Sequence, residues 1–222
     1  MDAGAPAGRL HRGQPRRHPA GGRSGGAAGL PRAGSLLLSE ACFSVWRHPR
    51  PTGAKGLCVG ARCDLPVPAR RAKRLARRIQ AHARRHRLLH EIWTSPLRRS
   101  ADVGRWLRRW GWIHHRDAAL SELDFGTWDG RPWSEIPKDE IDAWVADFAG
   151  GQPGGGESLE ALLRRVMTWS GERPGALVVS HGGWMLARRW VADHPDRTPA
   201  PEAWPQPPAY AERWSFPAGA RA

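Results

Sequence analysis

Two histidines and two arginines stand directly behind, or close behind, three short apolar runs of the sequence. These residues are Arg47 and His48 behind residues 41–46, Arg99 behind residues 91–95, and His181 behind residues 176–180. Ligands of parallel α/β sheets bind beyond the carboxyl ends of the strands, so the four side chains are expected to converge. A guanidinium group can bind two phosphoryl oxygens at once, and a neutral imidazole can attack phosphorus. The pattern predicts a site that handles phosphate.

The apolar runs alternate with segments of helical periodicity. In residues 69–88, Leu75, Ile79 and Ala83 recur every four positions on one face. Further helices are expected from Pro96 to about Trp110, over residues 139–148 with the stripe Ile141, Trp144, Val145 and Phe148, over residues 158–170 with Ser158 as N-cap, and behind Gly183 to Trp190. Strands alternating with helices predict a three-layer α/β fold, in which helices cover both faces of a mostly parallel central sheet.

The composition divides the chain into three parts. Residues 1–35 consist largely of Gly, Pro, Ala and Arg, and such a segment buries too little apolar surface to offset its ordering entropy. We expect it to be a disordered tail. Residues 36–198 form the predicted domain, and residues 199–222, rich in Pro and Ala, are expected to be an irregular C-terminal tail.

The charge indicates an anionic partner. The formal net charge is +14, from 35 Lys and Arg against 21 Asp and Glu. A small phosphorylated metabolite and nucleic acid are the two candidates. No nucleic-acid-binding module is recognisable, so no nucleic acid partner is expected, although a basic nucleic-acid-binding protein remains the alternative from a different functional class. The sequence indicates no oligomeric state.

Membranes, disulfides and metals are not expected. No apolar run approaches the roughly 20 residues that a membrane-spanning helix needs, so a cytoplasmic protein without a membrane partner is predicted. The three cysteines have the spacing of neither a disulfide framework nor a zinc site.

Five motifs resemble those of the histidine phosphatase superfamily, the phosphoglycerate-mutase-like group. In chain order they are Val45-Trp-Arg-His-Pro49, Thr94-Ser-Pro-Leu-Arg-Arg99, Leu120-Ser-Glu-Leu-Asp124 with its continuation to Gly130, Pro153-Gly-Gly-Gly-Glu-Ser158 followed by Arg165, and Val178-Val-Ser-His-Gly-Gly183. Five motifs in the order of the family make a specific signal. Pro49 replaces the usual glycine behind the histidine; it removes an N–H group and keeps the carbonyl.

The resemblance implies a phosphatase that acts through a phosphohistidine. His48 would be the nucleophile, and Arg47, Arg99 and His181 would hold the phosphoryl oxygens. Glu122 would protonate the leaving oxygen. The resemblance implies neither a metal nor another cofactor, because the arginines and the second histidine supply the positive charge.

Two of these assignments have neighbours that compete for the same role. Only the motif spacing favours Arg99 over Arg98. Asp124 and Asp129 are alternatives to Glu122 as the proton donor.

Within the superfamily, residues 125–158 resemble those of α-ribazole phosphatases, which remove phosphate from a nucleotide-like intermediate of cobalamin assembly. Trp128 and Trp133 are therefore expected in a substrate pocket, with Trp144 as a further candidate. Arg62 is a further pocket candidate, although an extra residue in its motif leaves open whether it reaches the phosphate. The expected substrate is α-ribazole 5′-phosphate, and the alternative is another small phosphorylated metabolite.

Overall fold

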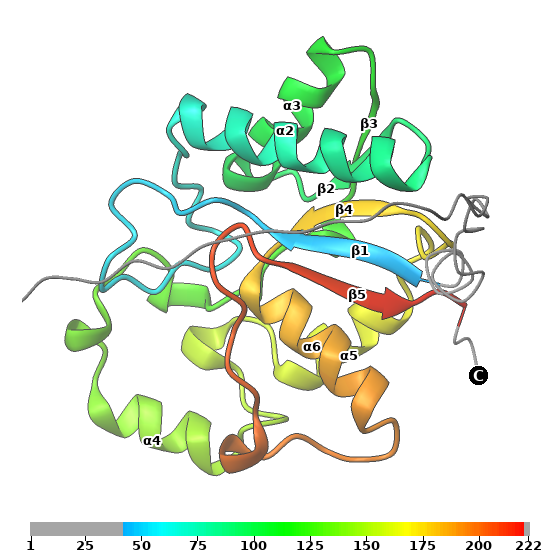
Figure 1. Ribbon diagram of the computed structural model, residues 1–222. Coiled ribbons are helices and arrows are strands. Elements are labelled where there is room, and N and C mark those ends of the chain that lie inside the picture. The colour runs from blue at the N-terminus through cyan, green and yellow to red at the C-terminus, as the bar shows by residue number, and fades with distance from the viewer. Residues whose placement is uncertain (1–41, 220–222) are drawn as a thin grey trace, which may run out of the picture. The chain divides into compact units, whose positions relative to one another are not determined.

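One five-stranded sheet organises the chain, with the strand order β3-β2-β4-β1-β5 (Figure 1). The structure is a computed structural model that describes residues 42–219, so the predicted tail 1–35 and residues 36–41 lie outside the described residues. The strands are β1 (Cys42–Arg47), β2 (Glu91–Thr94), β3 (Ile113–Arg116), β4 (Leu177–Ser180) and β5 (Arg213–Pro217). The first four run parallel, and β5 pairs with β1 in the antiparallel direction. The predicted mostly parallel α/β sheet is confirmed.

Helices cover both faces of the sheet (Figure 1). The α-helices are α2 (Ala69–His86), α3 (Arg98–Arg109), α4 (Lys138–Ala146), α5 (Leu159–Met167) and α6 (Gly182–Asp193). Single 3-10 turns occur at Ala118–Leu120, Gly126–Trp128, Trp133–Glu135, Pro153–Gly155 and Pro201–Ala203. The predicted helices are present with ends that differ by a few residues, and the Ser158 hydroxyl accepts a hydrogen bond from the N–H of Ala161, as an N-cap does.

Two apolar clusters hold the three layers together. On one face, Leu75 and Ile79 of α2 and Leu107 of α3 pack against Trp46 and Val179 of the sheet. On the other face, α5 and α6 pack against alternate residues of the same strands, among them Phe43, Val45 and Val178. Successive residues of a strand point to opposite faces, so each central strand contributes to both clusters.

Helix α4 stands apart from these layers, and its predicted stripe is only partly correct. None of its residues is buried, and Val145 is 43% exposed. Ile141 and Trp144 instead pack on a small third cluster around Trp128. A helix of nine residues that covers a loop needs a narrower apolar stripe than one that covers a sheet.

The predicted irregular C-terminal tail is wrong for residues 213–217, which form β5. The strand extends the sheet beyond β1, with Phe216 opposite Phe43 and Trp214 opposite Val45. Phe216 is its one buried residue. An edge strand with a single inward-facing apolar residue has little periodicity, and the Pro-rich stretch in front of it conceals the rest. β3, whose sequence Ile-His-His-Arg was not expected to be a strand, has no buried residue; its one apolar residue, Ile113, is 61% exposed, so the strand shows no apolar alternation.

Within residues 42–219, no helix combines the length and the apolar character that crossing a membrane requires.

Candidate active site

His48 lies immediately beyond the carboxyl end of β1 and is 4% exposed. Its backbone N–H donates to the carbonyl of Ser180 in β4, at 2.9 Å. The ring Nδ1 lies 2.8 Å from the carbonyl oxygen of Pro49. A carbonyl can only accept, so Nδ1 carries the proton and Nε2 keeps its lone pair. Burial and the nearby Arg99 and Arg47 charges hold the pKa of His48 well below its ordinary value, so the ring is neutral at pH 7 and its Nε2 lone pair is free.

His181 follows β4, and its ring centroid lies 4.9 Å from that of His48. Nε of Arg99 donates to Nδ1 of His181 at 3.2 Å, so His181 carries its proton on Nε2. That N–H donates to the hydroxyl oxygen of Ser95 at 2.6 Å. Burial, followed by the charge of Arg99, lowers the pKa of His181 well below its ordinary value. Both histidines are therefore neutral, and each has a defined tautomer.

Arg99 is completely buried at the first turn of α3. Besides Nε on His181, its Nη1 donates to the carbonyl of Cys63 at 2.6 Å and its Nη2 to that of Gly60 at 2.8 Å. None of these partners is a carboxylate, so the positive charge stays available to an incoming anion. Arg98 is exposed, and its N–H donates to Asp64. The structure therefore brings Arg99, and not Arg98, to the two histidines.

Arg47 is the last residue of β1 and also binds neutral groups. Its Nη1 donates to the carbonyl of Pro208 at 2.7 Å, and its guanidinium carbon lies 4.1 Å from the ring centroid of Tyr210. The opposite wall is Gly182 of α6, where a Cβ would come within 3.3 Å of that carbon. Nε of Arg47 is buried without a hydrogen-bond partner in the described residues. A phosphoryl oxygen is the kind of acceptor that this N–H group lacks.

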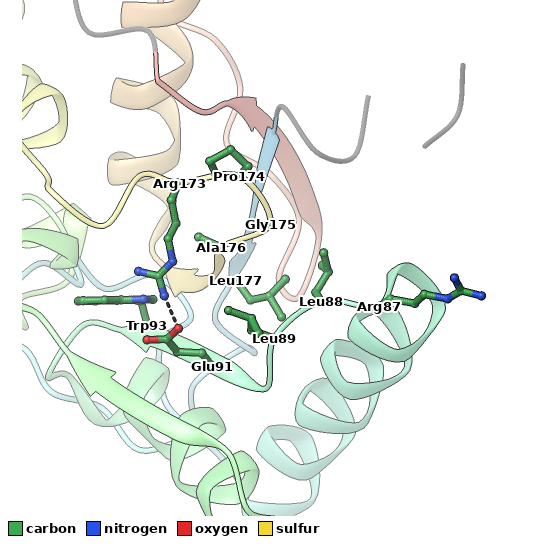
Figure 2. A pocket seen from close by; sticks show the side chains of 10 residues that line it. All are labelled: Arg87, Leu88, Leu89, Glu91, Trp93, Arg173, Pro174, Gly175, Ala176 and Leu177. Atoms are coloured by element: carbon green, nitrogen blue, oxygen red, sulfur yellow. Dashed lines mark hydrogen bonds and ion pairs between the residues drawn. The ribbon is translucent and has the colours of Figure 1, made fainter. Parts of the chain in front are cut away.

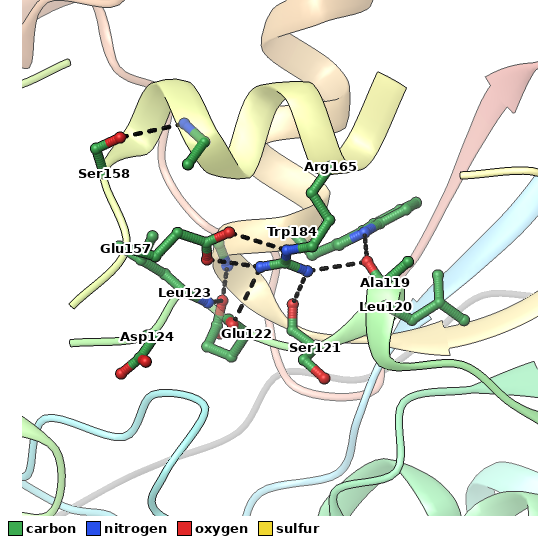
Figure 3. Close-up of polar contacts among 12 residues, drawn as sticks. Ala119, Leu120, Ser121, Glu122, Leu123, Asp124, Glu157, Ser158, Arg165 and Trp184 are labelled. Atoms are coloured by element: carbon green, nitrogen blue, oxygen red, sulfur yellow. Dashed lines mark hydrogen bonds and ion pairs between the residues drawn. The ribbon is translucent and has the colours of Figure 1, made fainter. Parts of the chain in front are cut away.

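Glu122 is 8% exposed and lies beside the start of α6 (Figure 3). Its Oε1 accepts hydrogen bonds from the N–H groups of Gly183 at 2.8 Å and Leu123 at 3.1 Å. A Cβ at Gly183 would collide with this oxygen, so only glycine permits the contact. Burial raises the pKa of Glu122, against the opposing charges of Arg99 and Arg47. A carboxyl group with a raised pKa can donate a proton near neutral pH.

The backbone around Glu122 is held by Arg165 of α5 (Figure 3). Nη1 of Arg165 donates to the carbonyls of Ala119 and Ser121, both at 2.9 Å, and Nη2 donates to that of Glu122 at 3.3 Å. The same guanidinium forms a bidentate ion pair with Glu157, in which Nε donates to Oε1 at 2.9 Å and Nη2 donates to Oε2 at 2.7 Å. One side chain thus fixes three carbonyl groups of the segment that carries Glu122.

A profile of the histidine phosphatase superfamily (branch 1) matches residues 44–204, which contain His48, Arg99, Glu122 and His181. The chain belongs to the histidine phosphatase superfamily. No curated protein matches it by sequence.

Several solved structures share this histidine phosphatase fold. The alpha-ribazole phosphatase from Shigella flexneri has a TM-score of 0.60 and 22% identity, over 78% of this chain and 89% of that one. The mycobacterial glucosyl-3-phosphoglycerate phosphatase complexed with VO3 has a TM-score of 0.60 and 22% identity, over 79% and 92%. A protein from Thermus thermophilus has a TM-score of 0.55 and 26% identity, over 69% and 82%. These likenesses concern the fold.

A cavity of about 410 Å³ adjoins Arg47 and Glu122 of this histidine phosphatase domain. Arg47, Glu122, Gly182 and Gly183 are among its lining residues, and both side chains lie against the two glycines at the start of α6. The remaining wall is mainly aromatic and apolar, with Phe125, Trp133, Trp144, Phe148, Trp204 and Tyr210 among the lining residues. A substrate whose phosphate lies against Arg47 would place its leaving group among these rings.

Of the residues that the superfamily resemblance places in a substrate pocket, two line the cavity and two do not. Trp133 and Trp144 line the cavity. Trp128 does not: it is 1% exposed, its indole N–H donates to Glu140, and it supports the ring of Trp144 from behind. Arg62 does not line the cavity either, since its exposed side chain pairs with Asp124 at 2.8 Å.

Asp124 and Asp129, the two alternatives to Glu122 as the proton donor, make hydrogen bonds that hold loops in place. Asp124 pairs with Arg62 and accepts from the N–H of Gly126 at 2.8 Å. Asp129 accepts from the N–H groups of Gly60 and Arg62. It thereby supports the segment whose carbonyls receive Arg99. Of the three carboxyl groups, Glu122 alone lines the cavity.

Sequence reasoning missed Tyr210 and Trp204, because both lie in the segment taken for an irregular tail. Two signals could have found them. Tyr210 is the one tyrosine of the chain, and a tail that has no role in the fold seldom carries large aromatic side chains such as these.

A second hollow, of about 160 Å³, lies at the opposite, amino-terminal edge of the sheet (Figure 2). Of its three charged residues, Arg87, Glu91 and Arg173, the last two form a hydrogen-bonded ion pair, and Nε2 of His115 lies 2.5 Å from the Glu91 carboxylate. The charge of Arg173 is thus compensated within the protein, unlike that of Arg47.

Proposed function

We propose that this chain hydrolyses phosphate monoesters through a phosphohistidine intermediate on His48. The observation that carries the proposal is that a cationic side chain and a protonatable carboxyl group line the same cavity. Arg47 is a cation held by neutral partners, and Glu122 is a buried carboxyl group with a raised pKa. The first suits the phosphoryl group, and the second suits the oxygen that leaves it.

The proposed reaction has two steps. Nε2 of His48 attacks phosphorus, the bond from phosphorus to the ester oxygen breaks, and Glu122 protonates that oxygen. Glu122, now a carboxylate, then takes a proton from a water molecule whose oxygen attacks the phosphohistidine. The phosphorus–nitrogen bond breaks and inorganic phosphate leaves, which restores neutral His48. The positive charges of Arg47 and Arg99 stabilise the negative charge in both steps, and His181 joins them when its N–H group exchanges the Ser95 hydroxyl for a phosphoryl oxygen.

We propose that no metal ion takes part. The groups around His48 are the guanidinium groups of Arg47 and Arg99, the imidazole of His181 and the ring of Tyr210, and the described residues contain no cluster of three or more His, Cys, Asp or Glu that could hold a metal. Activity should persist after dialysis against EDTA. Loss on chelation with recovery on addition of one divalent ion would overturn this part of the proposal.

The substrate we propose is α-ribazole 5′-phosphate, handled by a cytoplasmic enzyme of cobalamin assembly. Its base is flat and aromatic, and the cavity offers Phe125, Trp133, Trp144 and Trp204 as stacking or edge-to-face partners. A polar sugar acid would gain less from these walls. The likeness to the Shigella flexneri enzyme agrees with this choice at the level of the fold.

The experiment is a substrate panel with a matched control. α-Ribazole 5′-phosphate is compared with ribose 5-phosphate, which has a similar phosphoester and lacks the base. Aromatic contacts and burial of the base together predict a preference of at least about 100-fold in kcat/KM. Equal values for the two would remove α-ribazole phosphate, while phosphatase activity that survives in His48→Ala would remove the phosphohistidine mechanism.

A further inference from the structure

The segment 204–212, here called the strap, passes beside the active site between the last 3-10 turn and β5. Figure 1 shows it running from the neighbourhood of α4 to the carboxyl end of β1, where β5 begins. Trp204, Pro207 and Tyr210 of the strap line the cavity. The strap therefore contributes a wall to the site that the motifs of the superfamily do not contain.

Backbone hydrogen bonds attach the strap directly to the catalytic end of β1. The N–H of Ala211 lies 3.1 Å from the carbonyl oxygen of Arg47 and 3.3 Å from that of His48. The N–H of Arg47 in turn donates to the carbonyl of Glu212 at 3.0 Å. The carboxylate of Glu212 accepts from the N–H of Ala209 at 2.6 Å, which closes the turn around Tyr210. The position of the Tyr210 ring is thus set relative to Arg47.

Given the proposed function, we propose that Tyr210 is a positioning residue for Arg47. The tyrosine ring lies against the guanidinium group at 4.1 Å, and the carbonyl of Pro208 binds Nη1 at 2.7 Å. Together with Gly182 on the other side, they fix the plane of the guanidinium. In this plane Nε is buried and remains without a hydrogen-bond partner in the described residues, so it is the N–H group of Arg47 that still lacks an acceptor.

A ring suits this task better than a carboxylate does. An aspartate or glutamate would also orient Arg47, but it would neutralise the charge that must bind the phosphoryl oxygens. An aromatic face attracts the cation and leaves its N–H groups available at the edge. The ring of Tyr210 thus orients Arg47 without neutralising its positive charge. The charge of Arg165, in contrast, is paired with that of Glu157.

The test measures affinity for inorganic phosphate, a probe that has no leaving group. Tyr210→Phe keeps the ring and should stay within about twofold of wild type. Tyr210→Leu keeps an apolar wall without the ring and should weaken competitive inhibition by phosphate by about 2- to 30-fold, as loss of a cation–π contact predicts. The control is Trp106→Leu, which removes a ring that lies 4.8 Å from Arg109 on α3, far from the cavity. It should leave the inhibition constant unchanged.

A double substitution shows whether Tyr210 acts through Arg47. Phosphate binding to Arg47→Gln and to Arg47→Gln/Tyr210→Leu is followed by calorimetry, which requires no turnover. If the ring acts by positioning the arginine, the leucine substitution costs nothing further once Arg47 is absent. Equal losses with and without Arg47, or a Phe variant as impaired as Leu, would overturn the inference. A wild-type protein that binds no phosphate and hydrolyses no ester would instead reject the proposed function.

Discussion

Arg99 and His181 are joined by a single hydrogen bond of 3.2 Å from Nε to Nδ1, and this bond fixes the tautomer of the second histidine. The other two nitrogens of the same guanidinium hold the carbonyls of Gly60 and Cys63. The arginine thus links the end of β4, the start of α3 and the loop in front of α2. The planar arrangement of the three guanidinium nitrogens of Arg99 is therefore part of the site, in addition to the positive charge.

Arg99→Lys is accordingly expected to be far from conservative. An ammonium group has the charge but cannot reach three acceptors in the plane that Arg99 uses. We expect kcat to fall by about 100- to 1,000-fold, the scale for loss of one oriented donor. Arg98→Lys, the matched control at the neighbouring exposed position, should stay within about twofold of wild type. Steady-state kinetics on p-nitrophenyl phosphate decide the matter, and similar losses in both variants would contradict it.

Glu122→Gln should lose activity in proportion to the basicity of the leaving group. A sugar alkoxide needs a proton as the ester bond breaks, whereas p-nitrophenolate hardly does. In single-turnover experiments, the loss on a sugar phosphate should be about 100- to 10,000-fold, and that on p-nitrophenyl phosphate much smaller. Asp124→Asn and Asp129→Asn serve as controls and should show no such dependence. A uniform loss across the leaving groups in Glu122→Gln would take the acid role from this residue.

The pH profile of kcat/KM should be displaced to the acid side. In the proposed mechanism, activity requires neutral His48, and the lowered pKa of His48 keeps the ring neutral to pH values well below its ordinary range. Activity also requires protonated Glu122, whose raised pKa extends that form upward from its ordinary range, and activity falls as pH rises through this pKa. With a sugar phosphate as substrate, the basic limb that belongs to Glu122 should be absent in Glu122→Gln. An unchanged basic limb in that variant would assign it to another group.

Arg165→Gln should cause part of the loss of activity expected for Glu122→Gln, although Arg165 is not itself the proton donor. The substitution removes the bonds to Ala119, Ser121 and Glu122, so the backbone that carries the acid is free to shift. We expect a loss of about 10- to 100-fold on a sugar phosphate, because small displacements of catalytic groups have effects on this scale. The loss on p-nitrophenyl phosphate should be smaller. Arg164→Gln, at an exposed neighbouring position, is the control, and an identical loss on both substrates would show that Arg165 only stabilises the fold.

The convergence of the candidate site residues could be anticipated from sequence because most of them directly follow short apolar strands. His48 and His181 stand one residue beyond β1 and β4, so local pattern and sheet geometry suffice to bring them together. The Arg98–Arg99 ambiguity could not be resolved in that way, since it depends on which side of the first turn of α3 faces the site. Trp128 misled for a related reason: a large ring near the acid motif can support the pocket wall without being part of it.

The contributions of the strap and of Arg165 depend on contacts between distant parts of the chain. Tyr210 meets Arg47 across more than 160 positions, and nothing in the composition of residues 199–212 indicates which strand they approach. Arg165 belonged to a recognised motif, but its acceptors are backbone carbonyls, which carry no sequence signature. Such contacts become visible only when the fold is known.

The order of strands has a consequence for how the protein is made. β1 is the first described strand, yet it lies between β4 and β5, which are the last two. During synthesis, the edges of β1 therefore remain without partners until Leu177–Ser180 and then Arg213–Pro217 have left the ribosome. An apolar strand that waits for pairing is prone to associate with other chains. His48 follows this strand, so its surroundings are completed only after Arg213–Pro217 has been synthesised.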